Sequence, residues 1–291
     1  MDITLTLQCN NNCIFCPRQD YLKLIACGSL KEIHSDIEKT RFKSEKIVLS
    51  GGEVTLRQDL WSILTFCNSR GFKEIGLITN GRRLKELDFA ERLIRAGVKD
   101  FAVSLYSANE KIHDGITRRK GSARDTKKGI LNLLALSRVY PINIRVNLVL
   151  NYWNYEDLPD TLNKLVAWGV RNFIVAEQVI IDAKSKHLSL DEIKVFVKNI
   201  QELTLEDTRL CLRGFAFCLF GQSGGMSAQG IILKEKNPCI ILESQEVDTL
   251  VKEGGKKKAY MEAFGKLFFR MNKCNFCVLE SRCPGIQKAY F

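Results

Sequence analysis

The chain has 291 residues, of which 45% are hydrophobic and 26% are charged, with 44 Lys and Arg against 33 Asp and Glu. It contains no apolar run of the roughly 20 residues that a membrane span needs and no secretory signal at its N-terminus, so we expect a cytoplasmic globular protein that does not enter a membrane. The net charge of +11 favours anionic partners, but the basic residues are scattered and seldom alternate with aromatic ones, so we do not expect nucleic acid among those partners.

Short β-rich runs alternate with amphipathic helical patterns along the first two thirds of the chain. Strands are predicted over residues 2–7, 46–52, 74–81, 100–107, 142–151 and 172–180. A helix is predicted after each strand, over residues 29–39, 59–71, 84–97, 122–138, 154–169 and 189–203, and Ser122 is expected to cap the fourth. Six successive strand–helix units imply a parallel sheet with helices outside it. Because a closed barrel of this kind has eight units, we predict an α/β fold with a partial (β/α)6 TIM-like barrel.

The strand–helix pattern ends near residue 205, where we place a domain boundary. Beyond it the sequence predicts short strands and glycine turns, then a helix over residues 259–269 and a second group of cysteines. We therefore predict a barrel domain over residues 1–205 and a small α+β domain over residues 206–291.

Three of the eleven cysteines, Cys9, Cys13 and Cys16, directly follow the first predicted strand. In a reducing compartment, clustered thiols are candidate metal ligands rather than disulfide partners. Thiolates select zinc or iron–sulfur clusters, but a closed zinc site needs four ligands and no fourth cysteine lies nearby. A [4Fe–4S] cluster can be held through three of its irons while the fourth stays open to a substrate or cofactor, so we expect such a cluster here.

The stretch CNNNCIFC matches the CxxxCxxC motif, with an aromatic residue before its last cysteine, of the radical S-adenosylmethionine (SAM) superfamily. The resemblance continues in Gly-Gly-Glu at residues 51–53, Thr-Asn-Gly at 79–81, VSLYS with Ser104 and Ser107, and HDGITRRKGS downstream, and so covers roughly residues 1–205. It implies that the open iron chelates the amino and carboxylate groups of SAM. An electron from the cluster then cleaves the sulfonium C–S bond and releases a 5′-deoxyadenosyl radical, so that the cofactor performs the difficult chemistry.

The same resemblance assigns SAM contacts to residues 51–53, the Gly-Gly-Glu turn, and to residues 9–16, the cysteine loop. Gly51 and Gly52 let backbone carbonyls approach the SAM ammonium group, which a side chain would prevent, and Glu53 completes the motif. Phe15, between two of the cysteines, is expected to lie against the adenine. The alternative is an ordinary strand–helix turn with an exposed acid at Glu53.

Four further residues are candidates for SAM contacts by the resemblance. Thr79 and Ser104 are expected to hydrogen-bond the carboxylate or the ribose, and Arg118 or Arg119 to pair with the carboxylate. The alternative for the two hydroxyl residues is that they satisfy backbone groups at strand ends.

The second group of cysteines, Cys274, Cys277 and Cys283, has the spacing CxxCxxxxxC, which indicates a second metal site. It resembles the C-terminal extensions called SPASM and twitch, which carry auxiliary iron–sulfur clusters. The remaining cysteines are too few for two complete clusters, so we expect one auxiliary cluster, a [4Fe–4S] cluster, with Cys218 or Cys239 as its fourth ligand. A structural zinc site is the alternative.

Other cysteines and one histidine have less specific signals. We expect Cys67 and Cys211 to be small buried hydrophobic residues, whereas Cys27, in the loop after the motif, is a candidate hydrogen-atom donor. His113 lacks metal-ligand spacing and is expected to support a loop.

From the extension we expect an enzyme that modifies a peptide or protein residue, with a donor such as flavodoxin or ferredoxin supplying electrons. Because the chain begins directly at the first strand, we expect no leader-binding domain, so that a separate protein presents the peptide or the substrate is small. The alternatives are dehydrogenation or rearrangement of a small molecule in cofactor or antibiotic biosynthesis, and a non-catalytic iron–sulfur electron carrier. An open iron serves no purpose in a carrier, which argues against the last.

Overall fold

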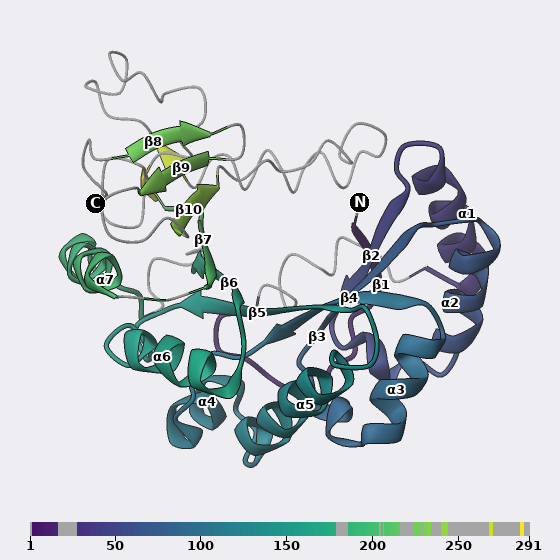
Figure 1. The fold of residues 1–291 in the computed structure, drawn as a ribbon, viewed down its shortest axis with the longest axis horizontal. Helices are drawn as coiled ribbons and strands as arrows, with labels where there is room; N and C mark the ends of the chain where they lie inside the picture. Colours follow the sequence, from purple (N-terminus) through teal and green to yellow (C-terminus); the bar gives the residue numbers. More distant parts are fainter. Residues whose placement is uncertain are drawn as a thin grey trace. The chain divides into compact units, whose positions relative to one another are not determined.

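The computed structural model describes residues 2–16, 28–178, 186–203, 205 and 207–215, and beyond these the short strands 224–227, 230–233, 240–243, 268–269 and 286–287 (Figure 1). The chain divides into two compact units, Met1–Val146 and Asn147–Phe291. This geometric division does not test the domain boundary expected near residue 205, which stays a prediction. In the described residues, no helix is long and apolar enough to cross a bilayer.

In the first unit, four strands pair in parallel and in chain order: β1 (Asp2–Thr6), β2 (Lys46–Gly51), β3 (Glu74–Thr79) and β4 (Val98–Ser104). The connections contain the helices α1 (Leu30–Arg41), α2 (Leu60–Ser69) and α3 (Leu87–Arg95), and the 3-10 turns η3 (Val54–Leu56) and η4 (Arg82–Lys85). The helices α4 (Glu110–Thr117) and α5 (Ser122–Leu136) follow β4 (Figure 1). Because the strands are parallel, the cysteine loop, the Gly-Gly-Glu turn and η4 all lie at the edge where the strands end.

Apolar side chains at every second position of the strands form the core of the first unit. Side chains of one face are 0–1% exposed, namely Ile47, Leu49, Ile75, Leu77 and Phe101. Alternate positions such as Ser50 and Asp100 belong to the other face, which is more polar. Apolar residues at alternate positions thus bury one face of the sheet and leave the other free to carry polar groups.

In the second unit, α6 (Leu158–Trp168) precedes β6 (Asn172–Glu177), and α7 (Leu190–Glu202) connects β6 to β7 (Arg209–Arg213), its parallel neighbour. The strand β10 (Ile240–Glu243) pairs in parallel with β7, and β9 (Gly230–Leu233) and β8 (Gly224–Ser227) extend it with antiparallel pairing. The strands β11 (Phe268–Phe269) and β12 (Ile286–Gln287) form a separate antiparallel pair. The strand β5 (Asn143–Leu150) crosses the division between the units.

The predicted α/β fold class is confirmed, since each predicted strand–helix unit of the first two thirds is present in order. Three details were wrong. The helix α4 was not predicted, and the N-cap of α5 is Gly121 rather than Ser122, which is the first helical residue. Phe268 and Phe269, at the end of the helix predicted over 259–269, form the strand β11.

Gly51 and Gly52 lie where the end of β2 meets the backbone that follows β1. A Cβ atom would stand 2.3 Å from the Thr6 carbonyl oxygen on Gly51 and 2.2 Å from the Gln8 carbonyl oxygen on Gly52. The Gly52 N–H donates to the Thr6 carbonyl (2.5 Å) and the Glu53 N–H donates to the Gln8 carbonyl (2.7 Å). Gly51 also has a φ of +130°, which favours glycine. The fold itself therefore requires both glycines, whatever they contact besides.

Replacing Gly52 with Ala should destabilise the protein by at least about 1–3 kcal/mol, because the new methyl group must displace the Gln8 backbone. Gly115 is the matched control, since it is exposed in α4 with nothing within 4 Å of an added Cβ, and Gly115→Ala should stabilise by about 0.5–1 kcal/mol. Urea unfolding of both variants measures the difference. A Gly52→Ala variant as stable as the unmodified protein would contradict the close approach.

Candidate functional site

The cysteine loop is held along its backbone by the end of α4. The Asn12 N–H donates to the Thr117 carbonyl (2.9 Å) and the Ile14 N–H donates to the Ile116 carbonyl (3.0 Å). These bonds satisfy carbonyls of the last helical turn, which have no partner within a helix. The loop therefore has a shape set by protein contacts on both sides of Cys13.

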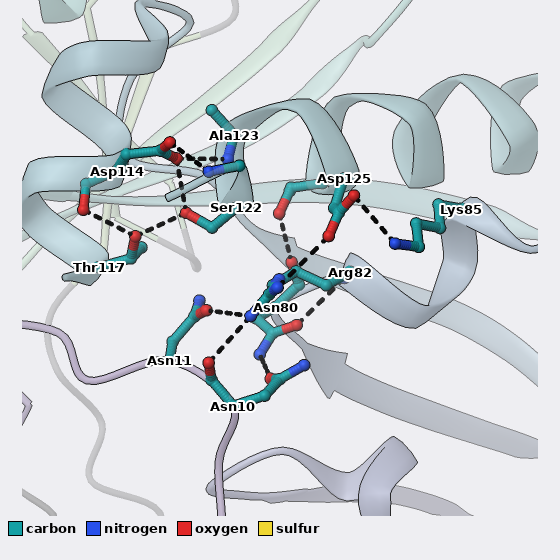
Figure 2. A network of polar contacts seen from close by, with 12 residues as sticks. Asn10, Asn11, Asn80, Arg82, Lys85, Asp114, Thr117, Ser122, Ala123 and Asp125 are labelled. Carbon is teal, nitrogen blue, oxygen red and sulfur yellow. Dashed lines mark hydrogen bonds and ion pairs between the residues drawn. The ribbon is translucent and has the colours of Figure 1, made fainter. Parts of the chain in front are cut away.

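Arg82, in η4, holds the same loop from the side of β3 (Figure 2). Its guanidinium group donates to the Asn10 carbonyl (2.9 Å) and to the Asn11 side-chain oxygen (3.3 Å). Asp125 of α5 pairs with Arg82 (3.4 Å) and with Lys85 (3.1 Å). The side chains of Arg82 and Asp125 are 19% and 14% exposed, so this network is worth more than a solvated surface pair.

The turn between α4 and α5 is built on Asp114 (Figure 2). Its carboxylate accepts hydrogen bonds from the Gly121 N–H (2.5 Å), the Ser122 hydroxyl (2.9 Å) and the Ala123 N–H (2.8 Å). Burial acts to raise the pKa of Asp114, but the bonds from Ala123, Gly121 and Ser122 together lower it below its ordinary value. Asp114 thus supplies the cap that the sequence assigned to Ser122, because a carboxylate is a stronger acceptor at a helix N-terminus.

Glu53 is fully buried (0% exposed) and its carboxylate accepts four hydrogen bonds. The donors are the Thr55 N–H (3.1 Å) and hydroxyl (2.6 Å), the Thr79 hydroxyl (2.7 Å) and the Asn80 N–H (2.7 Å). The alternative of an exposed acid is therefore wrong. The Thr79 hydroxyl also accepts from the Gly81 N–H (3.0 Å), so in this structure it joins β2 to the turn after β3.

The three cysteines of the loop are partly exposed, whereas Cys67 and Cys211 are buried, as expected. Burial raises the pKa of the Cys67 thiol to about 12, which keeps it protonated and inert. Polar groups approach two of the loop sulfurs. The Cys9 sulfur accepts from the Asn11 N–H (3.4 Å) and from the Asn80 side-chain amide (3.7 Å), and the Cys13 sulfur lies 4.0 Å from the Tyr106 hydroxyl.

Phe15, Tyr106 and His113 form an aromatic group beside the loop. The Phe15 ring meets the Tyr106 ring edge-on (4.9 Å between centroids), and the Tyr106 ring stacks on His113 (5.5 Å). The Tyr106 N–H donates to His113 Nδ1 (3.1 Å). Burial, and next the Cys13 thiol, hold the pKa of Tyr106 well above its usual range, so its hydroxyl stays protonated. His113 supports the turn after β4, as the sequence predicted.

The donor set fits an iron–sulfur cluster better than a single ion. Within the described ranges, no group of three or more His, Cys, Asp and Glu side chains is placed to hold one metal ion. A single zinc ion would gather its thiolates at about 2.3 Å from one centre, whereas a cluster binds each thiolate through a different iron. Three partly exposed thiols on one braced loop, two of them beside polar groups, suit the second arrangement.

The other predicted site residues lie either at the ends of β4 and α4 or outside the described ranges. Ser104 is partly exposed at the end of β4, and Arg118 and Arg119 are exposed after α4, so their SAM contacts stay predictions. Arg118 has a φ of 52° and ends α4 in the left-handed conformation. The residues outside the described ranges are Cys27, Cys218, Cys239, Cys274, Cys277 and Cys283.

Sequence reasoning missed three contacts of the site: Arg82 on the loop backbone, Asn80 on Cys9 and Tyr106 on Cys13. Asn80 and Tyr106 were quoted within motifs but were given no role. Their position within two residues of the ends of two parallel strands was the available signal, because such residues meet at one edge of the sheet.

Lowering the pH should destabilise the protein through His113, whose pKa burial lowers from 6.5 to about 4. Below pH 6.5 the His113 imidazole binds a proton in the unfolded chain but not in the folded one. The free energy of unfolding therefore falls as the pH decreases toward 4, by on the order of 3 kcal/mol in total. In His113→Asn, an amide oxygen can accept the Tyr106 N–H without titrating, so urea unfolding between pH 7 and 4.5 should show a flatter decline. An unchanged slope would show that His113 is not the group responsible.

Comparison with known proteins adds relatives in sequence and in structure. The model of the radical SAM superfamily matches residues 3–165. A "Probable GTP 3′,8-cyclase" of Methanopyrus kandleri is 31% identical over 169 residues, which are 56% of this chain and 51% of that protein. The chain thus spans about half the length of this curated relative.

Two solved structures share the fold. Streptococcus suis SuiB bound to the precursor peptide SuiA has a TM-score of 0.63 and 16% identity, covering 98% of this chain and 71% of that one. Native anSMEcpe with AdoMet and a peptide bound has a TM-score of 0.64 and 13% identity, covering 99% and 89%. At these identities the likeness shows the fold, the predicted α/β partial barrel. Since the family model covers more than half of the 291 residues, the chain belongs to the radical SAM superfamily.

Proposed function

We propose that this protein reductively cleaves SAM at a [4Fe–4S] cluster held by Cys9, Cys13 and Cys16 and directs the resulting radical to a hydrogen atom of a bound substrate. The observation that carries the proposal is the braced loop with three partly exposed thiols, one fewer than the irons of such a cluster. We propose that the remaining iron has an open position, which SAM takes. When bound, the cluster supplies the electron that breaks the sulfonium C–S bond of SAM. A carrier of electrons alone needs no such open position, which disfavours the carrier alternative.

We propose that the protein's own residues position SAM. The turn at Gly51 and Gly52 presents backbone at the sheet edge beside the loop, where carbonyl groups can accept from the SAM ammonium group. We propose Phe15 for the adenine, Ser104 for the ribose or carboxylate, and Arg118 or Arg119 for the carboxylate. We propose Thr79 and Glu53 as further SAM contacts, and their buried mutual hydrogen bond also fixes this turn.

We also propose one auxiliary cluster in residues 206–291. The spacing of Cys274, Cys277 and Cys283 supports it, and Cys218 or Cys239 would complete the ligand set. A fully ligated cluster there would relay electrons or shape the substrate pocket. Cys27 stays a proposed hydrogen-atom donor.

For the substrate we propose a peptide or protein residue. The support is the CxxCxxxxxC spacing, typical of the SPASM and twitch extensions, and the likeness of almost the whole chain to the fold of SuiB, whose structure holds a precursor peptide. A nucleotide is the second candidate, favoured by the 31% identity to the probable GTP 3′,8-cyclase and by the net charge of +11.

Cys13→Ala should abolish SAM cleavage and remove one cluster. Anaerobically reconstituted protein is given dithionite and SAM, and 5′-deoxyadenosine, iron and sulfide are quantified. Cys67→Ala is the matched control, since this buried thiol is no ligand and its loss should leave iron content and product unchanged. Full iron content in Cys13→Ala would refute the proposed ligand set.

Cys277→Ala should lose up to one cluster's iron while still releasing some 5′-deoxyadenosine.

The substrate is tested in the same assay with two probes. Synthetic peptides encoded by short reading frames beside the gene should raise 5′-deoxyadenosine release several-fold over the uncoupled rate and show a mass change, whereas GTP should not. Stimulation by GTP with a new nucleotide product would overturn the peptide proposal in favour of the second candidate.

A further inference from the structure

Polar groups lie beside two of the three loop sulfurs. Cys9 Sγ accepts from the Asn11 backbone N–H (3.4 Å) and from the Asn80 side-chain amide (3.7 Å). Cys13 Sγ lies 4.0 Å from the Tyr106 hydroxyl. Hydrogen bonds to ligating sulfurs stabilise the added negative charge of a reduced cluster and so raise its reduction potential.

The orientation of the Asn80 amide is fixed by its other partners. Its side-chain oxygen accepts from the Arg82 N–H (3.1 Å), which only an oxygen can do, so the NH₂ group is the end that faces the loop. That NH₂ group donates to the Asn10 side-chain oxygen (2.6 Å) as well as to Cys9. Asn80 is 8% exposed, and its backbone is bound on both sides by Glu53 and Thr126. The donor therefore stays in place without help from solvent.

Tyr106 is held in place by contacts of its ring and backbone. Its ring is bounded by the edge contact with Phe15 and the stack on His113, and its N–H is bound to His113 Nδ1. A cysteine that ligates iron has lost its proton and can only accept, so the tyrosine hydroxyl is the donor toward Cys13 in the loaded protein.

We infer that Asn80 and Tyr106 are positioning residues that donate hydrogen bonds to Cys9 and Cys13 and thereby raise the reduction potential of the cluster these cysteines hold. The inference rests on the proposed function, since it requires the cluster. A higher potential makes the cluster easier for an electron donor to reduce. Both residues would then affect electron entry without touching the substrate.

The test is a redox titration of the reconstituted protein followed by electron paramagnetic resonance. The signal to follow is the one that changes on adding SAM, which distinguishes the cluster with an open iron from an auxiliary cluster. Tyr106→Phe removes the hydroxyl and keeps the ring contacts, and Asn80→Ala removes the amide without adding charge. Each variant should keep its iron and titrate at a more negative midpoint potential than the unmodified protein, and the double variant should titrate at a more negative potential still.

Two control variants separate loss of a sulfur donor from general loosening. Tyr140→Phe removes a hydroxyl beyond the end of α5 that donates to Glu91 of α3 (2.6 Å), and should not move the potential. Asn11→Ala removes the side chain that Arg82 contacts but keeps the backbone N–H on Cys9, so its potential should also stay unchanged.

The outcomes distinguish the inference from the proposed function. Unchanged midpoint potentials in both Tyr106→Phe and Asn80→Ala, with full iron content, would overturn the inference and leave the function standing. An equal shift in Asn11→Ala would also overturn it, because loosening of the loop would then explain the effect. If the unmodified protein binds no cluster that responds to SAM, it is the proposed function that fails.

Discussion

The close approach of the Gly-Gly-Glu turn to the backbone after β1 is the constraint on which the rest of the site depends. The Thr6 and Gln8 carbonyls occupy the space that side chains on Gly51 and Gly52 would fill, and they accept from the amides of the turn. This contact sets where the cysteine loop begins. It also directs the side chain of Glu53 into the protein, where four hydrogen-bond donors satisfy its buried oxygens.

Local patterns in the sequence predicted most of the fold, whereas contacts between distant residues did not follow from it. Strands with alternating apolar residues were found in order because that period is a local property. The helix α4 was missed because eight residues containing Gly115 and Thr117 give little helical signal on their own. Ser122 was mistaken for a cap because the acceptor, Asp114, lies eight residues earlier and meets it only in the fold.

The same distinction holds for the site. The cysteine spacing and the Gly-Gly-Glu motif were recognisable because they are short local patterns that resemble those of the superfamily. The roles of Glu53 and Asn80 were not, since they depend on partners across the sheet, Thr79 for one and Cys9 for the other. The family model gives the superfamily, whereas the compared proteins differ in their names: one sequence relative is a probable GTP 3′,8-cyclase and one structural neighbour, SuiB, holds a precursor peptide, as expected where one fold supports many reactions.

Protein contacts shape the cysteine loop before any iron binds, and amide hydrogen exchange on iron-free protein tests this most directly. The amides of Asn12 and Ile14, bonded to α4, and of Gly52 and Glu53, bonded to the backbone after β1, should exchange far more slowly than in an unstructured peptide. If these amides exchange in the iron-free protein as fast as in an unstructured peptide, and are protected only after reconstitution, the account is contradicted. The loop would then take its shape only when the cluster binds.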